Sequence, residues 1–314
     1  MINLKTNYLS HLFIFFLIAL SGCSTTSDLK SDGLSLSKSR FAHAAINDGK
    51  MIYVFGGSNK KGFLSSIEQI NPNTNKIQVL KSKLIPRRYF SAVWDGEHSI
   101  YIIGGVSLKN KEFRYENRVE IFDTITHEVS FAKPLPYPTR INSAVFLNNN
   151  IFVFGGAYPN KSELVASALV SVYSVKQNKW MRAADMPTAK TTRSVVKDDK
   201  IYLVGGYNHK SALNVFEEFN PKTNKWISLP SMPVKMSAHS VTVIKDKLYT
   251  FGDYENLSST YVYDFKTKVW EKVDLGYKAS RHNAITTLDN TVYVIGGTIG
   301  SSGPFLDDIQ IFNL

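Results

Sequence analysis

"IYLVGG" (residues 201–206) is an apolar run that ends in two glycines, and close copies of it recur along the chain. The copies are "IYVFGG" (52–57), "IYIIGG" (100–105), "IFVFGG" (151–156), "LYTFGD" (248–253) and "VYVIGG" (292–297). Their first glycines are separated by 48, 51, 50, 47 and 44 residues. Regular spacing of this size is typical of proteins in which one supersecondary unit is repeated. The sequence therefore predicts a repeat protein with six units.

Each repeat has the composition of four short strands. The apolar run follows an "HAAI"-like strand, and a third strand ends at an aromatic residue or isoleucine before a polar turn such as "NPKTNKW" (220–226). Because the apolar run does not alternate with polar residues, both of its faces are expected to be dry. The turn is followed by a tryptophan in three repeats, and we expect Trp180, Trp226 and Trp270 to be buried between neighbouring units.

The glycine pair, the aromatic residue and the tryptophan, at a spacing of about 50 residues, resemble the kelch repeat. The resemblance covers residues 34–314 and implies an all-β, six-bladed β-propeller with four-stranded blades. The last repeat ends at Leu314 without a fourth strand, whereas "GLSLSKSR" (33–40) is similar to the fourth-strand segment "WISLPSMPVKM" (226–236). We expect the N-terminal strand to complete the last blade and close the ring, which would leave no open sheet edge.

The first 23 residues differ from the rest of the chain. Lys5 is followed by an apolar run and by "LSGC" (20–23), the layout of a secretory signal whose apolar core is too short to span a membrane. "LSGC" resembles the lipobox of bacterial lipoproteins, which implies a signal peptide over 1–22, lipidation of Cys23 and a flexible tether over 23–33. Ser24, in place of aspartate, implies the outer membrane, facing the periplasm or the cell surface. The alternative is an ordinary cleaved signal with an incidental cysteine.

Charge and composition narrow the class of partner. The chain carries 37 basic and 26 acidic residues, a formal net charge of +11. This balance favours anionic partners: a small molecule, a glycan, an acidic peptide or lipid phosphate. We expect no nucleic-acid partner, since no nucleic-acid-binding module is visible, and a monomeric protein. Seven scattered histidines and one cysteine favour neither a metal site nor a copper-dependent kelch oxidase, and no cofactor is expected.

Long cations stand 15 or 16 residues before the first glycine of five repeats, at the expected entry to the innermost strand. They are Arg40, Arg88, Arg140, Lys190 and Arg281. Three residues further on, His43, Arg193 and His239 are expected deeper in the central channel. Guanidinium groups that converge on one axis suit forked contacts with carboxylates or phosphates, and kelch proteins that capture acidic peptides look similar. The alternative is structural, with each cation bonded to neighbouring backbone carbonyls.

Aromatic side chains follow the glycine pairs in loops that should open on the same face. Tyr158, Tyr207 and Tyr254 are candidate ligand contacts there, because aromatic rings beside cations hold sugars and extended peptides. The sequence thus predicts a membrane-anchored binding or scaffold module for an anionic glycan or peptide. The alternative is an exported sialic-acid mutarotase, similar to N-acetylneuraminate epimerases, which would need an acid–base carboxylate. Glu116, Glu163 and Glu255 lie in suitable loops, and no motif selects among them.

Overall fold

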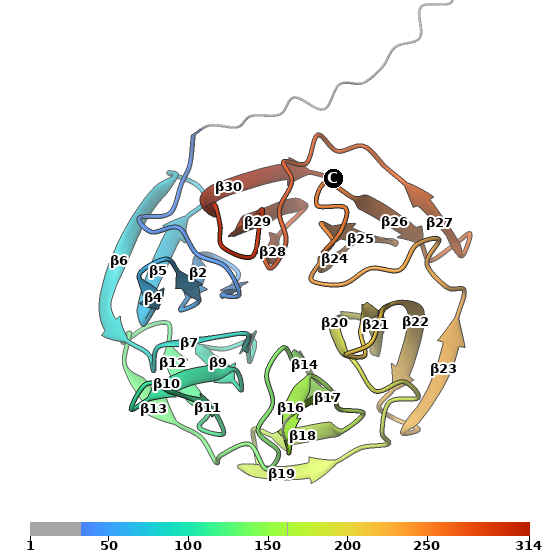
Figure 1. Cartoon of the computed structure of the whole chain (residues 1–314), viewed down its shortest axis with the longest axis horizontal. Helices are drawn as coiled ribbons and strands as arrows, with labels where there is room; N and C mark the ends of the chain where they lie inside the picture. The colour runs from blue at the N-terminus through green and yellow to red at the C-terminus, as the bar shows by residue number, and fades with distance from the viewer. Residues whose placement is uncertain (1–32, 162) are drawn as a thin grey trace, which may run out of the picture.

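The computed structural model describes residues 33–161 and 163–314, which form a ring of six antiparallel blades around a central axis (Figure 1). The first blade consists of β1 (Ala44–Asn47), β2 (Ile52–Phe55), β5 (Ser66–Asn71) and β6 (Lys76–Lys83). The second consists of β8 (Ser91–Trp94), β9 (Ser99–Ile103), β12 (Glu120–Asp123) and β13 (Val129–Phe131). The third consists of β14 (Ser143–Leu147), β15 (Asn150–Phe154), β18 (Val170–Ser174) and β19 (Lys179–Arg182). The fourth blade consists of β20 (Thr191–Lys197), β21 (Lys200–Tyr207), β22 (Ala212–Asn220) and β23 (Lys225–Leu229). The fifth consists of β24 (Ser240–Ile244), β25 (Lys247–Phe251), β26 (Thr260–Asp264) and β27 (Val269–Lys272). The last contains β28 (Ala284–Leu288), β29 (Thr291–Thr298) and β30 (Phe305–Asn313).

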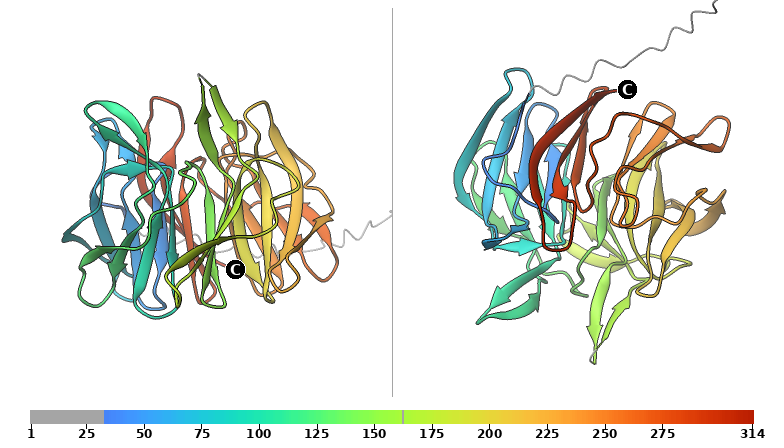
Figure 2. Two further views of the ribbon diagram at one scale, coloured as in Figure 1. Left: turned by 90° about the horizontal axis from the view of Figure 1, so that it is seen from below. Right: turned by 45° about the horizontal axis from the view of Figure 1, so that its top comes forward.

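The first strand of every blade is innermost, and neighbouring first strands contact each other around the axis (Figure 1). The predicted all-β, six-bladed propeller is therefore confirmed. Shorter strands add hairpins to the blades: β3 (Ser58–Asn59), β4 (Gly62–Phe63), β7 (Arg87–Arg88), β10 (Val106–Lys109), β11 (Glu112–Tyr115), β16 (Ala157–Asn160) and β17 (Glu163–Ala166). Figure 2 shows that the β10–β11 and β16–β17 hairpins project from the same face of the ring. No helix among the described residues is long and apolar enough to span a membrane.

The hydrophobic core is divided among the six junctions between blades. In β2, Tyr53 and Phe55 pack against Phe122 of the second blade, whereas Ile52 and Val54 belong to the cluster shared with the last blade. Side chains of a strand point alternately to its two faces, so both faces of this central strand are buried. This arrangement explains why the glycine-terminated runs are apolar throughout.

The glycine pairs let neighbouring backbones approach closely. Gly206 adopts φ +122°, and a Cβ atom there would lie 1.9 Å from the Thr191 carbonyl oxygen. The amides of these second glycines reach the next blade: Gly57 N donates to Arg87 O at 2.9 Å and Gly156 N to Lys190 O at 3.0 Å. Glycine is required here both by the positive φ and by the absence of space for a side chain.

The three predicted tryptophans lie between blades, where each is partly buried and packs against the hydrophobic cluster of its junction, as expected. Each indole N–H donates to a backbone carbonyl of the preceding blade: Trp180 to Lys133 at 2.9 Å, Trp226 to Ala184 at 3.0 Å and Trp270 to Pro230 at 3.1 Å. The fourth strands, which carry these tryptophans, lie at the outer rim of the ring (Figure 1). These tryptophans therefore connect blades by a polar contact as well as by packing.

The last blade is completed by the N-terminal segment, as predicted. Leu36 N donates to Asp307 O at 2.8 Å, Ile309 N donates to Leu34 O at 3.1 Å, and Ser35 bridges to Asp308. Leu36 is 3% exposed and packs in the cluster between the last and first blades. The segment expected to hold the signal peptide, Cys23 and most of the tether lies outside the described residues.

Closure by this segment makes a testable prediction. Replacing Leu36 by alanine should lower the free energy of unfolding by about 2–5 kcal/mol, because the change removes buried apolar contacts at the closing blade. Lys38→Ala is the matched control, since Lys38 is exposed in the same segment. Urea unfolding of the two variants measures the difference. Equal stabilities would show that the segment is not needed to close the ring.

Candidate functional site

Three of the long cations near the blade entries are buried and paired inside their own blades. Arg40 pairs with Glu68, Arg87 with Glu120 and Lys190 with Glu217, and each of these glutamates comes from the third strand of the same blade. Arg40 also donates to Gly56 O at 2.9 Å, and Arg87 donates to Gly104 O at 3.0 Å. The prediction that Arg40 and Lys190 face the central funnel is wrong, because their charges are already neutralised within the blades.

The predicted cations differ in environment because they occupy two adjacent positions at the blade entry, one residue apart. The carbonyls of Arg40, Arg87 and Lys190 accept hydrogen bonds from second glycines, so these three residues are structurally equivalent. Arg88, Arg140 and Arg281 instead occupy the next position, where their backbones pair with Val106, Ala157 and Thr298 after the glycine pairs. In an extended chain, a shift of one residue turns the side chain to the opposite side. Counting back 15 or 16 residues combined the two positions.

Arg88, Arg140 and Arg281 gather with aromatic rings at the end of the axis where the glycine pairs lie. We call this the mouth cluster, and it also contains Phe41, Phe63, Tyr89, Phe113, Tyr254 and His282. The guanidinium carbon of Arg281 lies 3.7 Å from the centre of the Tyr254 ring, and that of Arg140 lies 5.6 Å from the Tyr89 ring. The Tyr89 ring in turn contacts His282, with centroids 5.3 Å apart. The three predicted arginines are thus brought together across three blades.

The described part of the chain does not neutralise the charges of the mouth cluster. Within residues 33–161 and 163–314, no carboxylate lies within ion-pairing distance of Arg88, Arg140 or Arg281. The buried Nε atom of each of these arginines has no hydrogen-bond partner there. Burial and the nearby Arg140 lower the pKa of Arg88. Burial and the surrounding arginines also lower the pKa of His282 to about 3, so the only positive charges of the cluster at neutral pH are the guanidinium groups.

The three candidate tyrosines have different locations. Tyr254 belongs to the mouth cluster, and Tyr207 is an exposed ring 5.4 Å from His209, whose pKa is lowered by burial and by the charge of Arg140. Tyr158 instead lines a separate groove of about 330 Å³ with Leu135 and Tyr137, between the second and third blades. The structure therefore unites Tyr254, and at its border Tyr207, with the arginines, and places Tyr158 apart from them.

The two candidate histidines are packed between blades. A Cβ atom on Gly296 of the last blade would lie 3.0 Å from His43 Cε1, and one on Gly205 of the fourth blade would lie 3.3 Å from His239 Cε1. Burial and Arg40 lower the pKa of His43 well below its usual value, and burial lowers that of His239 to about 3. Both are therefore neutral at physiological pH; His43 lines the central cavity, and a role of the two histidines as ligand contacts stays a prediction.

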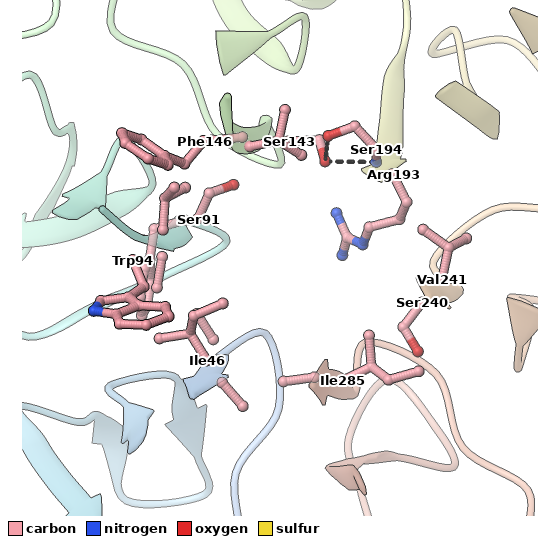
Figure 3. Close-up of a pocket in the computed structure, with 18 of the residues that line it drawn as sticks. Ile46, Ser91, Trp94, Ser143, Phe146, Arg193, Ser194, Ser240, Val241 and Ile285 are labelled. Atoms are coloured by element: carbon pink, nitrogen blue, oxygen red, sulfur yellow. Dashed lines mark hydrogen bonds between the residues drawn. The ribbon is translucent and has the colours of Figure 1, made fainter. Parts of the chain in front are cut away.

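Arg193 does reach the axis, below the mouth. It begins the regular part of β20 after a bulge, and its guanidinium points into the central cavity (Figure 3). Its Nε donates to His239 O at 3.0 Å and its Nη1 to Thr192 O at 3.3 Å. The predicted channel position of Arg193 is confirmed.

The candidate acid–base glutamates do not share one environment. Glu116 is fully buried, accepts hydrogen bonds from Ser107 and Arg118, and pairs with Arg118 at 2.7 Å. Burial opposes its ionisation, but these hydrogen bonds and charges hold its pKa below the usual value. Glu163 lies on the exposed β16–β17 hairpin, and the amide of Glu255 donates to Asp253. No group of three histidine, cysteine or acidic side chains comes together in the part of the chain that the structure describes.

Sequence reasoning missed Phe41, Tyr89 and His282, which supply the aromatic part of the mouth cluster. Each lies at or directly after the entry position, and Tyr89 and His282 have φ of 60° and 52°. The available signal was the dipeptide of a cation and an aromatic or histidine residue, Arg88–Tyr89 and Arg281–His282. This dipeptide indicates a cluster only once the register of the entry strand shows that both of its side chains lie at the mouth.

The neighbouring residues Arg87 and Arg88 provide a direct test of this register. Arg87→Ala should lower the free energy of unfolding by about 3–5 kcal/mol, because it leaves Glu120 buried without its partner. Arg88→Ala should change it by less than about 1 kcal/mol, because that guanidinium has no carboxylate partner to strand. Chemical unfolding of both variants measures this contrast, and a reversed order would contradict the assignment.

Comparison with known proteins supports the architecture. The chain matches two family models, the KLHDC2/KLHL20/DRC7 Kelch-repeats domain over residues 141–314 and the Attractin/LZTR1 beta-propeller over residues 2–216. It is 30% identical over 180 residues to Kelch-like protein 40 of Xenopus tropicalis, which covers 56% of this chain and 29% of the relative. It is 28% identical over 171 residues to Kelch-like protein 36 of Rattus norvegicus, covering 52% of this chain and 28% of that protein.

A longer match, at 23% identity over 230 residues, is to Kelch-like protein terF of Aspergillus terreus, covering 68% of this chain and half of the relative. The chain thus spans less than a third of the length of the first two relatives and half of the third. The segments that the two family models match contain the glycine pairs and four-stranded blades described above. The repeat pattern, the blade topology and both family models together show that this chain belongs to the kelch-repeat β-propeller family.

Proposed function

We propose that this protein is a binding module whose mouth cluster holds an anionic, carboxylate-bearing ligand such as an acidic peptide or an acidic glycan. The observation that carries this proposal is the convergence of Arg88, Arg140 and Arg281 without any carboxylate partner among the described residues. Like charges held together are unfavourable unless an anion offsets them. A bound ligand with several carboxylates would supply that offset.

The aromatic rings favour a ligand with an extended or ring-shaped body. Phe63 and Phe113 stack at 6.2 Å beside Arg88, and Tyr254 stacks on Arg281. Guanidinium groups bind carboxylates through two parallel hydrogen bonds, while flat rings contact the apolar faces of sugars or side chains. The β10–β11 and β16–β17 hairpins rise from this face and would limit the directions along which such a ligand could lie (Figure 2).

Binding at the mouth should depend on charge. A labelled peptide of alternating aspartate and glycine serves as the probe, with fluorescence anisotropy as the measurement. Replacing Arg88 and Arg140 together by glutamine should weaken binding by about 100-fold or more, because charge-assisted hydrogen bonds contribute about 1.5–3 kcal/mol each. Affinity for the wild-type protein should also fall as salt rises from about 50 to 300 mM, because salt screens exposed charges.

Arg182→Gln is the control for that experiment. Arg182 is exposed on β19 in an outer strand and is paired with Asp185, so its replacement changes net charge without touching the mouth. Equal losses of affinity in Arg182→Gln and in the double mouth variant would indicate non-specific attraction to a basic protein. Such a result would contradict the proposed site.

The mutarotase alternative is tested on the same site with N-acetylneuraminate. It requires a carboxyl group of raised pKa beside the arginines, whereas Glu116, the buried loop glutamate, is held ionised by Arg118. No observation favours this activity over binding. Accelerated exchange between the two anomers, followed by proton NMR, would nevertheless show an enzyme and would replace the binding proposal.

We further propose that the propeller is tethered to the bacterial outer membrane through lipidation of Cys23, as "LSGC" suggests. More than one acyl chain is needed for stable anchoring, because each buried CH₂ contributes only about 0.8 kcal/mol. Cys23→Ser should move the protein from the membrane pellet to the soluble fraction after export. Ser24→Ala keeps the cysteine and is the control, and a serine variant that still pellets with the outer membrane would refute lipidation.

A further inference from the structure

The six innermost strands surround a cavity of about 540 Å³ along the axis (Figure 3). None of the aromatic rings of the mouth cluster lines it. It is lined by β1, β8, β14, β20, β24 and β28, so every blade contributes to its wall. Its volume is within the range of pockets that hold small organic ligands, about 300–1,000 Å³. The cavity is therefore large enough for a small molecule.

One level of this wall carries hydroxyl groups from four consecutive blades. The residues at this level are Ser91, Ser143, Ser194 and Ser240. The Ser143 and Ser194 hydroxyls lie 2.8 Å apart, and Ser91 donates to Asn142. Ser240 is 2% exposed, and its Oγ has no hydrogen-bond partner among the described residues. An unpartnered buried hydroxyl is costly, and a polar ligand group would satisfy it.

Arg193 lies beside these hydroxyls and points into the cavity (Figure 3). Its two hydrogen bonds use Nε and Nη1, so Nη2 has no partner in the part of the chain that the structure describes. No aspartate or glutamate is among the described residues that line the cavity. Burial alone lowers the pKa of Arg193 to about 10, which leaves the side chain charged at neutral pH. The cavity thus holds a cation without a counter-ion.

The remainder of the cavity wall is mostly apolar, with His43, Asn47 and Asn283 as its other polar residues. Ile46, Val241 and Ile285 line it, and Trp94 and Phe146 stand near the ends of β8 and β14 (Figure 3). From Ser143 to Phe146, three residues along a strand correspond to about 10 Å. One end of the cavity therefore suits a negative charge, and the next 10 Å or so suit a hydrocarbon.

We propose that the central channel is a second binding site, one that takes a small amphipathic monocarboxylate. The carboxylate would accept hydrogen bonds from Arg193 Nη2 and from Ser240 Oγ, and the apolar tail would extend along the channel toward Trp94 and Phe146. Arg193 would supply the charge, and the hydroxyl level would supply neutral donors around it. This site uses none of the three mouth arginines, so it does not depend on the proposed function of the mouth.

Octanoate is the probe, with 1-octanol and octylamine as the neutral and cationic counterparts of equal chain length. Isothermal titration calorimetry should show saturable binding of octanoate to the folded protein and binding at least tenfold weaker for the other two. Octanoate should also change the fluorescence of Trp94, the one tryptophan in the channel wall of the described chain. Loss of that change in Trp94→Phe, with binding retained, would place the tail at the predicted end.

Arg193→Gln should weaken octanoate binding at least tenfold, and Arg193→Lys should restore part of it. Ser240→Ala, which removes only the unpartnered hydroxyl, should weaken octanoate binding a few-fold. This variant tests the proposed site if the arginine variants do not fold. Arg88→Gln is the matched control at the mouth and should leave octanoate affinity within twofold. Equal affinity for octanol and octanoate, or unchanged affinity in folded Arg193→Gln or Ser240→Ala, would overturn the proposal.

Discussion

The hydrogen bond from the second glycine of one blade to the entry carbonyl of the next is the interaction on which the rest of this structure depends. It joins Gly57 to Arg87, Gly156 to Lys190 and Gly297 to Arg40, at 2.9–3.0 Å. A side chain on any of these glycines would collide with the entry segment of its own blade, so the backbone can lie this close to that segment and still reach the next blade only because the residue is glycine. This contact sets where each blade entry stands relative to the axis.

That placement divides the basic residues into two groups with different roles. Residues whose carbonyls receive the glycine bond point into their own blades, and there Arg40, Arg87 and Lys190 meet buried glutamates. Residues one position later point toward the mouth and meet aromatic rings instead of carboxylates. Buried pairs of the first kind are costly to break and stabilise the blades, whereas unpaired cations of the second kind are available to a ligand. Adjacent arginines, Arg87 and Arg88, illustrate the division.

The fourth blade has a different backbone conformation from the other five at the mouth, and this difference places the charge of Arg193 in the central channel. Ala42, Tyr89, Ile141, Ala238 and His282 share a left-handed conformation, and backbone hydrogen bonds link most of them around the axis. At the corresponding place, β20 has a bulge between Thr191 and Arg193. Bulges redirect side chains, and here Arg193 bonds the carbonyls of Thr192 and His239 while its remaining donors face the cavity.

The sequence by itself determined the number of blades, their four-stranded pattern and the completion of the last blade by residues 34–36. These features follow from the glycine pairs and apolar runs, because each blade contains one central strand that is buried on both faces and the pattern therefore recurs once per blade. It also indicated that arginines would gather near the axis. Only the tertiary structure decided which ones do, because the entry strands differ in length by one residue and that difference reverses a side chain. Counter-ions from distant strands, Glu68, Glu120 and Glu217, were equally invisible in the sequence, since pairing depends on the blade's register. The tertiary structure also decided how far the three tryptophans are exposed, because their exposure is set by their position at the outer rim of the ring.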